Sequence, residues 1–337
     1  MRVADFHYDL ADTSIAQSAI EPRHDSRLLY SSDMSDHRFL DLADLLEPGD
    51  LLVVNDTRVR PARLVGRRVD TGGNVELLLL DRRSDGWWDA LARPSRRLRP
   101  GIVLEFDGLS ATVESIPDGG MVAVSLDSDD EEAVIGSTGS IPLPPYFTGT
   151  LSDADRYQTI YAREPGSAAA PTAGLHFTDE VLARLDETGV NMTTVDLHVS
   201  LDTFRPMSVD DIEDHEMHTE WCSVPVESVA RIDDTRAAGA KVVAVGTTVV
   251  RTLESMADGR GGVRSGSHRT DLFIRPGYEF KVVDAMITNF HMPSSTLLVL
   301  LAAFMGSGWR ELYETALIRG YRFLSFGDAM YVEPRRI

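Results

Sequence analysis

Six short strand-like segments follow one another between residues 64 and 126, and they restrict the possible folds more than any other part of the chain. Each is rich in apolar and β-branched residues, and Gly, Pro, Asp or Asn residues separate it from the next. This spacing, with no helical pattern between the segments, is typical of a small all-β barrel or sandwich. The predicted strands are residues 64–68, 75–80, 87–92, 102–106, 111–116 and 121–126.

Strand and helix patterns alternate on both sides of this region. Residues 51–54 and 241–245 are continuous apolar runs of the kind found in buried strands. Residues 179–188 carry the start and stop signals of a helix. The sequence therefore predicts an α/β fold in which an all-β domain interrupts the core. In full, we expect a mixed α/β, barrel-like core formed by residues 1–62 and 147–337, and an inserted small all-β barrel domain over residues 63–146.

Other patterns are weaker. Residues 6–10, 272–274 and 280–287 resemble strands, and residues 259–267 are rich in Gly and Ser, as flexible loops are. The apolar residues 296–305 are too few to span a bilayer, so we expect a buried helix there.

Four of the nine histidines lie within residues 168–221. They are His176, His198, His215 and His218. Imidazole titrates near neutrality, so a cluster of histidines can exchange protons with a substrate. Asp196 and His198 alternate with apolar residues, which places both side chains on one face of a predicted strand. A structural hydrogen bond is the alternative for any one of the four, and it stays open here.

His215, His218 and Glu220 form an H-x-x-H-x-E pattern that is similar to part of a metal site. No clear helix carries this pattern, and the chain has one cysteine. Zinc sites use firmer spacings of His and Cys. We therefore expect no metal.

The chain of 337 residues carries a formal net charge of -20, which argues against broad binding to polyanions. The charge is uneven, however. Residues 58–99 hold eleven arginines, no lysine and five acidic residues, while residues 101–136 hold nine acidic residues and no basic one. Arginine suits forked contact with phosphate, so the first of these zones is a candidate nucleic-acid surface. A solvated, salt-bridged face is the alternative.

The single cysteine, Cys222, excludes an internal disulfide and suits a reducing cytoplasm. The opening residues, MRVADFHYDLADTSIAQ, lack the apolar centre of a signal peptide. Both features favour a cytoplasmic protein without a membrane partner.

A predicted strand, a glycine and two hydroxyl residues precede a helical pattern at Gly246, Thr247 and Thr248. The N-terminus of a helix presents backbone N–H groups and a positive dipole end, which suits an anion. The further glycines and the lysine of the known nucleotide-binding loops are missing, so the pattern indicates an anion site of another kind. Simple capping of the helix by the threonines is the alternative.

Six longer motifs are distributed along the whole chain. They are NDTRVRPARL from Asn55, APTAGLHFT from Ala170, HEMHTEW from His215, AVGTTVVRTLES from Ala244, TNFHMPSSTLL from Thr288 and YRFLSFGDAM from Tyr321. Together and in this order, the motifs resemble the S-adenosylmethionine:tRNA ribosyltransferase-isomerase family of queuosine biosynthesis. The opening residues and Tyr157-Gln158-Thr159 are similar to that family too.

This resemblance implies a cytoplasmic enzyme with an α/β core and an inserted β-barrel. The family transfers the ribosyl part of S-adenosylmethionine to the aminomethyl group of a 7-deazaguanine at the tRNA wobble position. Adenine and methionine leave, and an epoxycyclopentanediol remains on the base. S-adenosylmethionine is then a consumed substrate, no separate cofactor is expected, and the partners are this substrate and the tRNA. We expect a monomer.

The chemistry of the family needs a base that removes a proton from the carbon next to the sulfonium. His176 or His198 is the candidate base, with Asp196 or Glu220 to orient or stabilise the imidazolium. The candidate residues for binding S-adenosylmethionine are Thr172, Gly174, Gly246, Thr247, Thr248, Arg251, Asp284, Asn289 and His291. The candidate residues for binding tRNA phosphates are Arg23, Arg27, Arg58, Arg60, Arg63, Arg96, Arg97 and Arg99.

The chain departs from the family pattern around His198, where LHVSLDTF replaces LHVGxGTF. Ser200 and Asp202 stand where glycines are usual, and Asp196 stands where threonine is usual. Glycine allows positive φ and close approach of a substrate, so these changes bear on the acceptor or the rate. Two alternatives to the family reaction follow from them: an S-adenosylmethionine-using enzyme with a small-molecule acceptor, and a non-catalytic RNA-binding relative.

Overall fold

The computed structural model describes residues 1–149, 151, 153–163, 165–199 and 206–334, so Ser200 and Asp202 lie outside the described residues. The chain forms two compact units. The first, which we call the core, comprises Met1–Arg58, Pro144–Glu164 and Ala170–Ile337. The second, which we call the barrel unit, comprises Val59–Leu143 and Pro165–Ala169. The barrel unit includes the later segment because strands β4 (Arg58–Val59) and β11 (Pro165–Ser167) form a two-stranded sheet.

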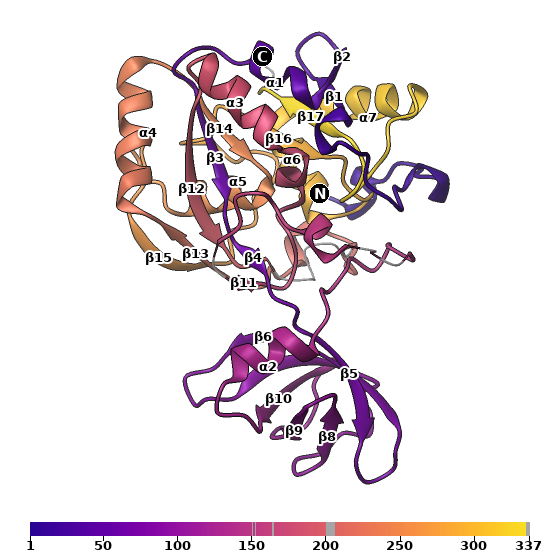
Figure 1. The fold of residues 1–337 in the computed structure, drawn as a ribbon. Coiled ribbons are helices and arrows are strands. Elements are labelled where there is room, and N and C mark those ends of the chain that lie inside the picture. Colours follow the sequence, from indigo (N-terminus) through magenta and orange to yellow (C-terminus); the bar gives the residue numbers. More distant parts are fainter. Residues whose placement is uncertain (150, 152, 164, 200–205, 335–337) are drawn as a thin grey trace. The chain divides into compact units, whose positions relative to one another are not determined.

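The core is built on one nine-stranded mixed sheet (Figure 1). In sheet order its strands are β15 (Gly266–Thr270), β13 (Glu220–Val224), β12 (Asn191–Leu197), β3 (Leu51–Asn55), β14 (Val242–Val245), β16 (Ala285–Asn289), β17 (Ala329–Val332), β1 (Arg27–Tyr30) and β2 (Ser35–Arg38). The four central strands β12, β3, β14 and β16 are parallel to one another. The predicted α/β core with an all-β barrel is confirmed, although the core sheet of the described residues is open rather than barrel-like.

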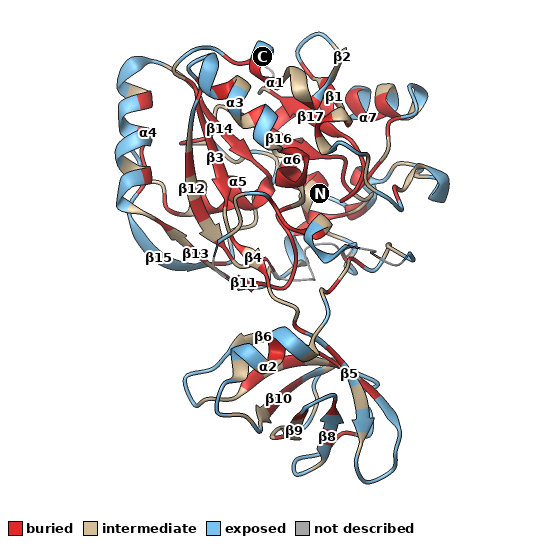
Figure 2. Ribbon diagram, in the orientation of Figure 1, coloured by how far each residue is buried: buried red, intermediate tan, exposed pale blue. Residues whose placement is uncertain are grey.

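Successive residues of the central strands point to opposite faces of the sheet, and each face has its own apolar core. On one face, Leu51 and Val53 pack with α4 (Val226–Ala238), α5 (Thr247–Ser255), α6 (Thr296–Met305) and α7 (Gly308–Ile318). On the other, Leu52 and Val54 pack with α1 (Leu42–Leu45) and α3 (Asp179–Glu187). Figure 2 shows the result, with buried strands inside and the outer face of α4 exposed.

Local signals explain where the helices begin and end. Thr178 caps α3, since its hydroxyl accepts a hydrogen bond from the Val181 N–H at 3.4 Å. Ser295 caps α6 in the same way and Gly306 ends it, as expected for the apolar segment that they enclose. Nearly all of α6 is buried. Short 3₁₀ turns complete the described core: η1 (Val3–Phe6), η2 (Asp12–Ser14), η3 (Arg23–Asp25), η4 (Phe39–Asp41), η5 (Ala154–Tyr157), η6 (Thr172–His176) and η8 (Ile212–Asp214).

The barrel unit contains a closed antiparallel barrel of six strands, one for each strand predicted from the sequence. In barrel order they are β10 (Met121–Leu126), β7 (Trp88–Arg93), β6 (Asn74–Arg82), β5 (Arg63–Arg68), β8 (Val103–Phe106) and β9 (Leu109–Val113). Helix α2 (Glu131–Thr138), which the sequence analysis did not predict, follows β10. The entry and exit of the unit lie together, since Arg63 and Ser140 exchange backbone hydrogen bonds of 3.1 and 2.9 Å. Gly139 passes so close that a Cβ there would lie 1.6 Å from the Pro61 carbonyl oxygen.

Several predictions for the core were wrong. Residues 272–274 and 280–284 form no strand, and the segment expected to be a Gly- and Ser-rich loop ends in the edge strand β15. Residues 6–10 form no strand either. The sequence analysis also missed β1, β2, β13 and α4. Helix α4 buries Ser228, Ile232 and Thr235 at helical spacing, and its two polar members hide this face from a hydrophobic pattern.

No helix in the described part of the chain combines the length and the apolar character that crossing a membrane requires.

Candidate active site

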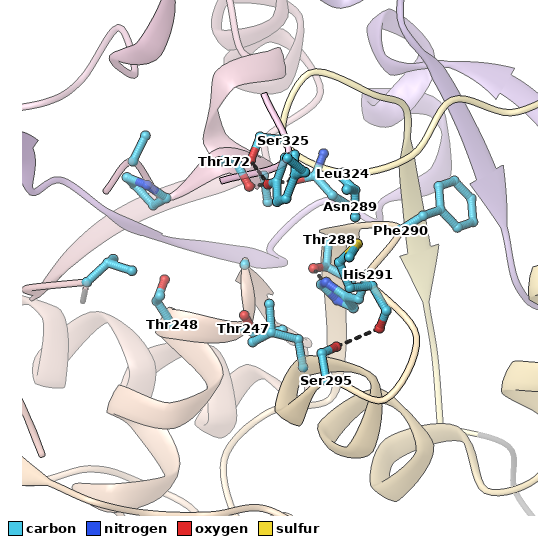
Figure 3. A pocket seen from close by; sticks show the side chains of 18 residues that line it. Thr172, Thr247, Thr248, Thr288, Asn289, Phe290, His291, Ser295, Leu324 and Ser325 are labelled. Atoms are coloured by element: carbon cyan, nitrogen blue, oxygen red, sulfur yellow. Dashed lines mark hydrogen bonds between the residues drawn. The ribbon is translucent and has the colours of Figure 1, made fainter. Parts of the chain in front are cut away.

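The carboxyl ends of β14 and β16 define the candidate site, because these parallel neighbours end at the same edge of the sheet. After β14 the chain turns at Gly246 into α5, and β16 runs through Asn289 to His291. A pocket lies between these two strand ends and the turn η6 (Figure 3). The described residues that line it are Tyr146, Ala170, Pro171, Thr172, Ala173, Val199, Gly246, Thr247, Thr248, Thr288, Asn289, Phe290, His291, Met292, Ser295, Leu297, Leu324 and Ser325.

The N-terminus of α5 opens into this pocket. Gly246 has φ of 93°, a conformation that side chains disfavour, and no described side chain caps the helix. The first N–H groups of a helix have no partner within it, so they remain available to a ligand. The hydroxyl of Thr248 is buried and has no hydrogen-bond partner among the described residues. Uncapped N–H groups, the helix dipole and this hydroxyl together form a place for an anion.

Asn289 and Thr172 form a second polar group on the wall of the pocket. The Thr172 hydroxyl donates to Asn289 Oδ1 at 2.8 Å, and Asn289 Nδ2 lies 3.0 Å from His176 Nε2. His176 itself does not line the pocket, since it lies behind Asn289 with its ring stacked on Phe39. The sequence analysis placed His176 among possible bases, but in the structure the Asn289 side chain lies between its ring and the cavity.

His291 is the one imidazole among the described residues that line the pocket. Its Nε2 lies 3.2 Å from the Thr288 hydroxyl, and no described residue contacts its Nδ1 by a hydrogen bond. The Tyr8 hydroxyl donates to the carbonyl of His291, and the His291 N–H donates to the Tyr313 hydroxyl at 2.8 Å. Burial lowers the pKa of His291 to about 3, so the ring is neutral near pH 7.

His198 and Asp196 lie together at the end of β12, outside the pocket lining. His198 Nε2 is 3.5 Å from Asp196 Oδ2, and the imidazole ring is 4.5 Å from the Trp221 ring. Asn55 fixes this strand end, because its amide donates to the Leu197 carbonyl at 3.0 Å and accepts from the Leu197 N–H at 3.2 Å. The pair therefore has a fixed position next to Val199, which does line the pocket.

The structure separates four other candidate residues from the pocket. Glu220 and Arg251 form a buried ion pair with each other, and neither lines the cavity. Gly174 serves packing, since a Cβ there would lie 2.2 Å from the Tyr161 hydroxyl oxygen. Asp284 lies at the opposite end of β16, where it accepts hydrogen bonds from neighbouring backbone and side-chain donors.

The candidate tRNA arginines of the core are engaged with other residues. Arg23 donates to the carbonyl of Asp155 at 2.8 Å, and Arg58 lies 3.7 Å from the carboxylate of the same residue. Arg27 pairs with Asp36 at 2.9 Å. These contacts favour the salt-bridged alternative for Arg27 and Arg58, and they engage Arg23 with backbone carbonyls.

The candidate tRNA arginines of the barrel unit divide into a paired group and an unpaired group. Arg60 and Arg63 pair with carboxylates at 3.1 and 2.8 Å, and Arg99 donates to two nearby carbonyls. Arg96 and Arg97 are exposed, and they have no ion-pair partner among the described residues. They lie in the segment between β7 and β8, which therefore carries two adjacent positive charges; Arg67 and Arg93 of the same unit are likewise exposed and have no ion-pair partner among the described residues.

Sequence reasoning missed Tyr8, Ser26 and Tyr146. Ser26 bonds to His176, and Tyr146 lines the pocket and contacts Ser325 at 2.5 Å. The available signal was weak, since Ser26 lies in a charged segment, Tyr8 lies in a segment wrongly predicted to be a strand, and Tyr146 lies outside any predicted element.

Hydroxyl, amide and imidazole groups beside a helix N-terminus, at the carboxyl edge of a mixed sheet, form the arrangement of an enzyme that binds a small anionic ligand. A family model described as queuosine biosynthesis protein matches residues 3–332. The chain therefore belongs to that family, as its motifs indicated.

Two relatives and one solved structure agree with the family model. The chain is 52% identical over 342 residues to an S-adenosylmethionine:tRNA ribosyltransferase-isomerase of Anaeromyxobacter sp. (strain Fw109-5), covering 98% of both chains. It is 49% identical over 341 residues to the protein of that name in Moorella thermoacetica, covering 98% of this chain and all of the relative. The crystal structure of S-adenosylmethionine tRNA ribosyltransferase from Thermotoga maritima is similar with a TM-score of 0.55 and 36% identity, over 97% of this chain and 99% of that one.

Proposed function

We propose that the chain transfers and isomerises the ribosyl part of S-adenosylmethionine onto 7-aminomethyl-7-deazaguanine at the wobble position of tRNA. The products are epoxyqueuosine in the tRNA, adenine and methionine, and the enzyme uses no separate cofactor. The observation that carries the proposal is the pocket, in which an uncapped helix N-terminus lies beside a neutral imidazole and a paired amide and hydroxyl. Relatives of about 50% identity over their full length supply the reaction.

The methionyl carboxylate of the substrate is assigned to the N-terminus of α5. The site has no cationic side chain among its described lining residues, so backbone N–H groups and the Thr248 hydroxyl would carry the anion. Arg251, which the sequence analysis placed here, is neutralised by Glu220 on another part of the fold.

His291 is assigned as the base that removes the proton from the carbon next to the sulfonium. The burial that lowers its pKa keeps the ring neutral at neutral pH, so one of its two nitrogens carries no proton, and the hydrogen-bonded backbone holds the ring in one place. A carboxylate bound at α5 would raise the pKa of this imidazole and make it a stronger base. His198 with Asp196 remains the alternative base from the sequence analysis.

The described lining encloses about 50 Å³, far less than the roughly 300–1,000 Å³ of whole ligand pockets. We therefore assign to it only the parts of the substrate that reach the N-terminus of α5 and Asn289, with adenine outside. The cytoplasm is the proposed location, where the buried thiol of Cys222 would stay reduced.

An assay of adenine release tests the function. The full chain is incubated with S-adenosylmethionine and tRNA that carries the 7-deazaguanine precursor, and adenine, methionine and the modified base are measured by chromatography. We expect adenine and methionine in equal amounts, with none released when this tRNA is omitted. Release that does not need tRNA would establish a small-molecule acceptor instead, and tRNA binding without release would establish a non-catalytic relative.

Arg96 and Arg97 are assigned to the tRNA backbone, because they are exposed and lack ion-pair partners among the described residues. Replacing both with Ala should weaken tRNA binding and reduce the slope of log affinity against log salt by about one for each lost phosphate contact. The matched control replaces Arg82 and Arg83, which belong to the same unit and pair with carboxylates. Equal losses in the two double variants would show that net charge, and not this segment, governs binding.

A further inference from the structure

A chain of hydrogen bonds connects Ser26 to the pocket through His176. Ser26 Oγ lies 2.7 Å from His176 Nδ1, and Asn289 Nδ2 lies 3.0 Å from His176 Nε2. The Thr172 hydroxyl then donates to Asn289 Oδ1 at 2.8 Å. Ser26, His176 and Asn289 are all more than nine-tenths buried, so water does not compete for these contacts.

The contacts determine where the proton of His176 resides. Asn289 Nδ2 also lies 3.3 Å from the carbonyl oxygen of Asp328. A carbonyl only accepts hydrogen bonds, so the amide nitrogen must face Asp328 and His176, and the amide oxygen must face Thr172. Nε2 of His176 therefore accepts, and the neutral ring carries its proton on Nδ1, which donates to Ser26 Oγ.

Both nitrogens of His176 are thus occupied, and neither is directed at a substrate. Burial lowers the pKa of His176 to about 3, and the positive charges of Arg322, Arg156 and Arg23 act in the same direction. Phe39 stacks on the imidazole at 5.0 Å between ring centres and prevents it from turning aside. A ring that is neutral, fully bonded and covered is suited to hold a neighbour in place.

We propose that His176 is a positioning residue, which holds the Asn289 amide so that Asn289 Oδ1 and the Thr172 hydroxyl oxygen present two adjacent acceptors to the ribose diol of the substrate. The Thr172 proton is already donated to Asn289, so both oxygens have lone pairs left for a ligand. The described pocket lining contains no carboxylate, which favours neutral hydroxyl donors over an ammonium group as the partner. The identity of the diol rests on the proposed function, whereas the tautomer of His176 does not.

The tautomer is measured directly on the wild-type chain. With ¹⁵N-labelled histidine, long-range ¹⁵N–¹H NMR spectra distinguish a protonated Nδ1 from a protonated Nε2, and we expect the Nδ1–H form with no titration of His176 between pH 5 and 8. Asn289→Asp removes the amide donor, so His176 should then take up a second proton at measurable pH. A wild-type His176 with its proton on Nε2, or one that titrates near neutrality, would overturn the proposal whatever the activity.

Kinetics separate positioning from base catalysis. His176→Gln keeps an acceptor for the Asn289 amide, and we expect it to retain most activity. His176→Leu removes the acceptor and should lower kcat/KM for S-adenosylmethionine roughly tenfold to a hundredfold, mostly through KM. Equal loss of kcat in both variants would make His176 the base and refute positioning. The control pair is His268→Gln and His268→Leu, since His268 is exposed on the edge strand β15. If wild-type protein releases no adenine at all, the proposed function fails while the NMR result still decides the role of His176.

Discussion

The two ends of strands β14 and β16 differ in whether their buried polar groups have hydrogen-bond partners within the protein. At the amino ends of β14 and β16, Asp284 accepts from Arg236 at 2.6 Å and from the Val242 N–H at 2.8 Å. Glu254, at the end of α5, accepts from four donors of the segment 278–283. At the carboxyl ends, the Thr248 hydroxyl has no hydrogen-bond partner among the described residues, and no described side chain caps the first turn of α5.

Cavity size alone would place the site at the amino ends, whereas the unpaired polar groups place it at the carboxyl ends. The cavity at the amino ends encloses about 960 Å³, against about 50 Å³ at the carboxyl ends. Its charged lining is already paired within the protein, as in the contact of Lys241 with Glu333 at 2.6 Å. A buried polar group without a partner costs about 1–3 kcal/mol, so a fold keeps one mainly where a ligand completes it. An unpaired hydroxyl beside an uncapped helix N-terminus therefore indicates the site better than volume does, whereas a single unpaired hydroxyl, such as that of Tyr331 near Asp284, does not indicate one by itself.

The largest test of this comparison is His291→Asn. The change removes the proposed base and should lower adenine release about 10²- to 10⁴-fold, while the thermal unfolding midpoint stays close to that of the wild type. Asp284→Asn at the opposite end is the control and should leave kcat unchanged. If the two variants lose activity equally, the catalytic end of the sheet has been assigned incorrectly.

Glu254→Gln tests the amino ends of the strands, where the polar groups are paired and serve stability. An amide at this position turns a donor toward backbone N–H groups, so the free energy of unfolding should fall by about 3 kcal/mol in denaturant titration. The kcat of the folded protein should stay the same, because Glu254 does not contact the pocket. A large fall in kcat with unchanged stability would place chemistry at the amino ends.

Acid should destabilise the protein because two buried histidines at the carboxyl ends of the strands, His176 and His291, resist protonation in the folded chain. His176 and His291 have pKa values of about 3 in the folded chain, below the ordinary value of 6.5, so the unfolded chain binds protons first as the pH falls. The free energy of unfolding should decrease from about pH 6.5 toward pH 3, by up to about 1.4 kcal/mol per pH unit for each histidine. His291→Gln should flatten this dependence between pH 7 and pH 5 relative to the wild type. An unchanged slope would mean that the imidazole is not held neutral in the fold.

Thr248→Val should give the smallest effect, with opposite signs for stability and binding. Removing an unsatisfied buried hydroxyl should raise the free energy of unfolding slightly, by up to about 1 kcal/mol. The KM for S-adenosylmethionine should rise several-fold, because the anion loses a donor. Parallel losses of stability and affinity would show that this hydroxyl serves packing.

The sequence predicted elements whose signals are local. The six barrel strands follow from alternation between turn residues, and α3 follows from the Thr178 cap. The strand, glycine and helix predicted around Gly246 are likewise present, and the anion site predicted there stays a prediction. By contrast, β15 is four-fifths exposed and depends on its pairing with β13, a contact that no local pattern reveals.

The candidate site was predictable where residues follow strand ends, as Asn289 and His291 do. The role of His176 was not, because its partner Ser26 is 150 positions away in the sequence. Asp284 precedes Asn289 by five residues in the sequence, but along a strand this spacing separates them by roughly 16 Å at about 3.3 Å per residue. Whether a charged residue is neutralised, as Arg251 is by Glu220, likewise depends on the tertiary fold.

The paired backbone of Arg63 and Ser140 has a consequence for how this segment can be exchanged. A closed barrel whose entry and exit residues are hydrogen-bonded to each other fills one gap in the chain without holding the flanking residues far apart. We expect that a short turn could replace the chain between Arg63 and Ser140, although Pro165–Ala169, which also belong to the barrel unit, would remain. Gly139 would have to stay glycine in such an exchange, because any larger side chain there would collide with the Pro61 carbonyl and push the two chain segments apart.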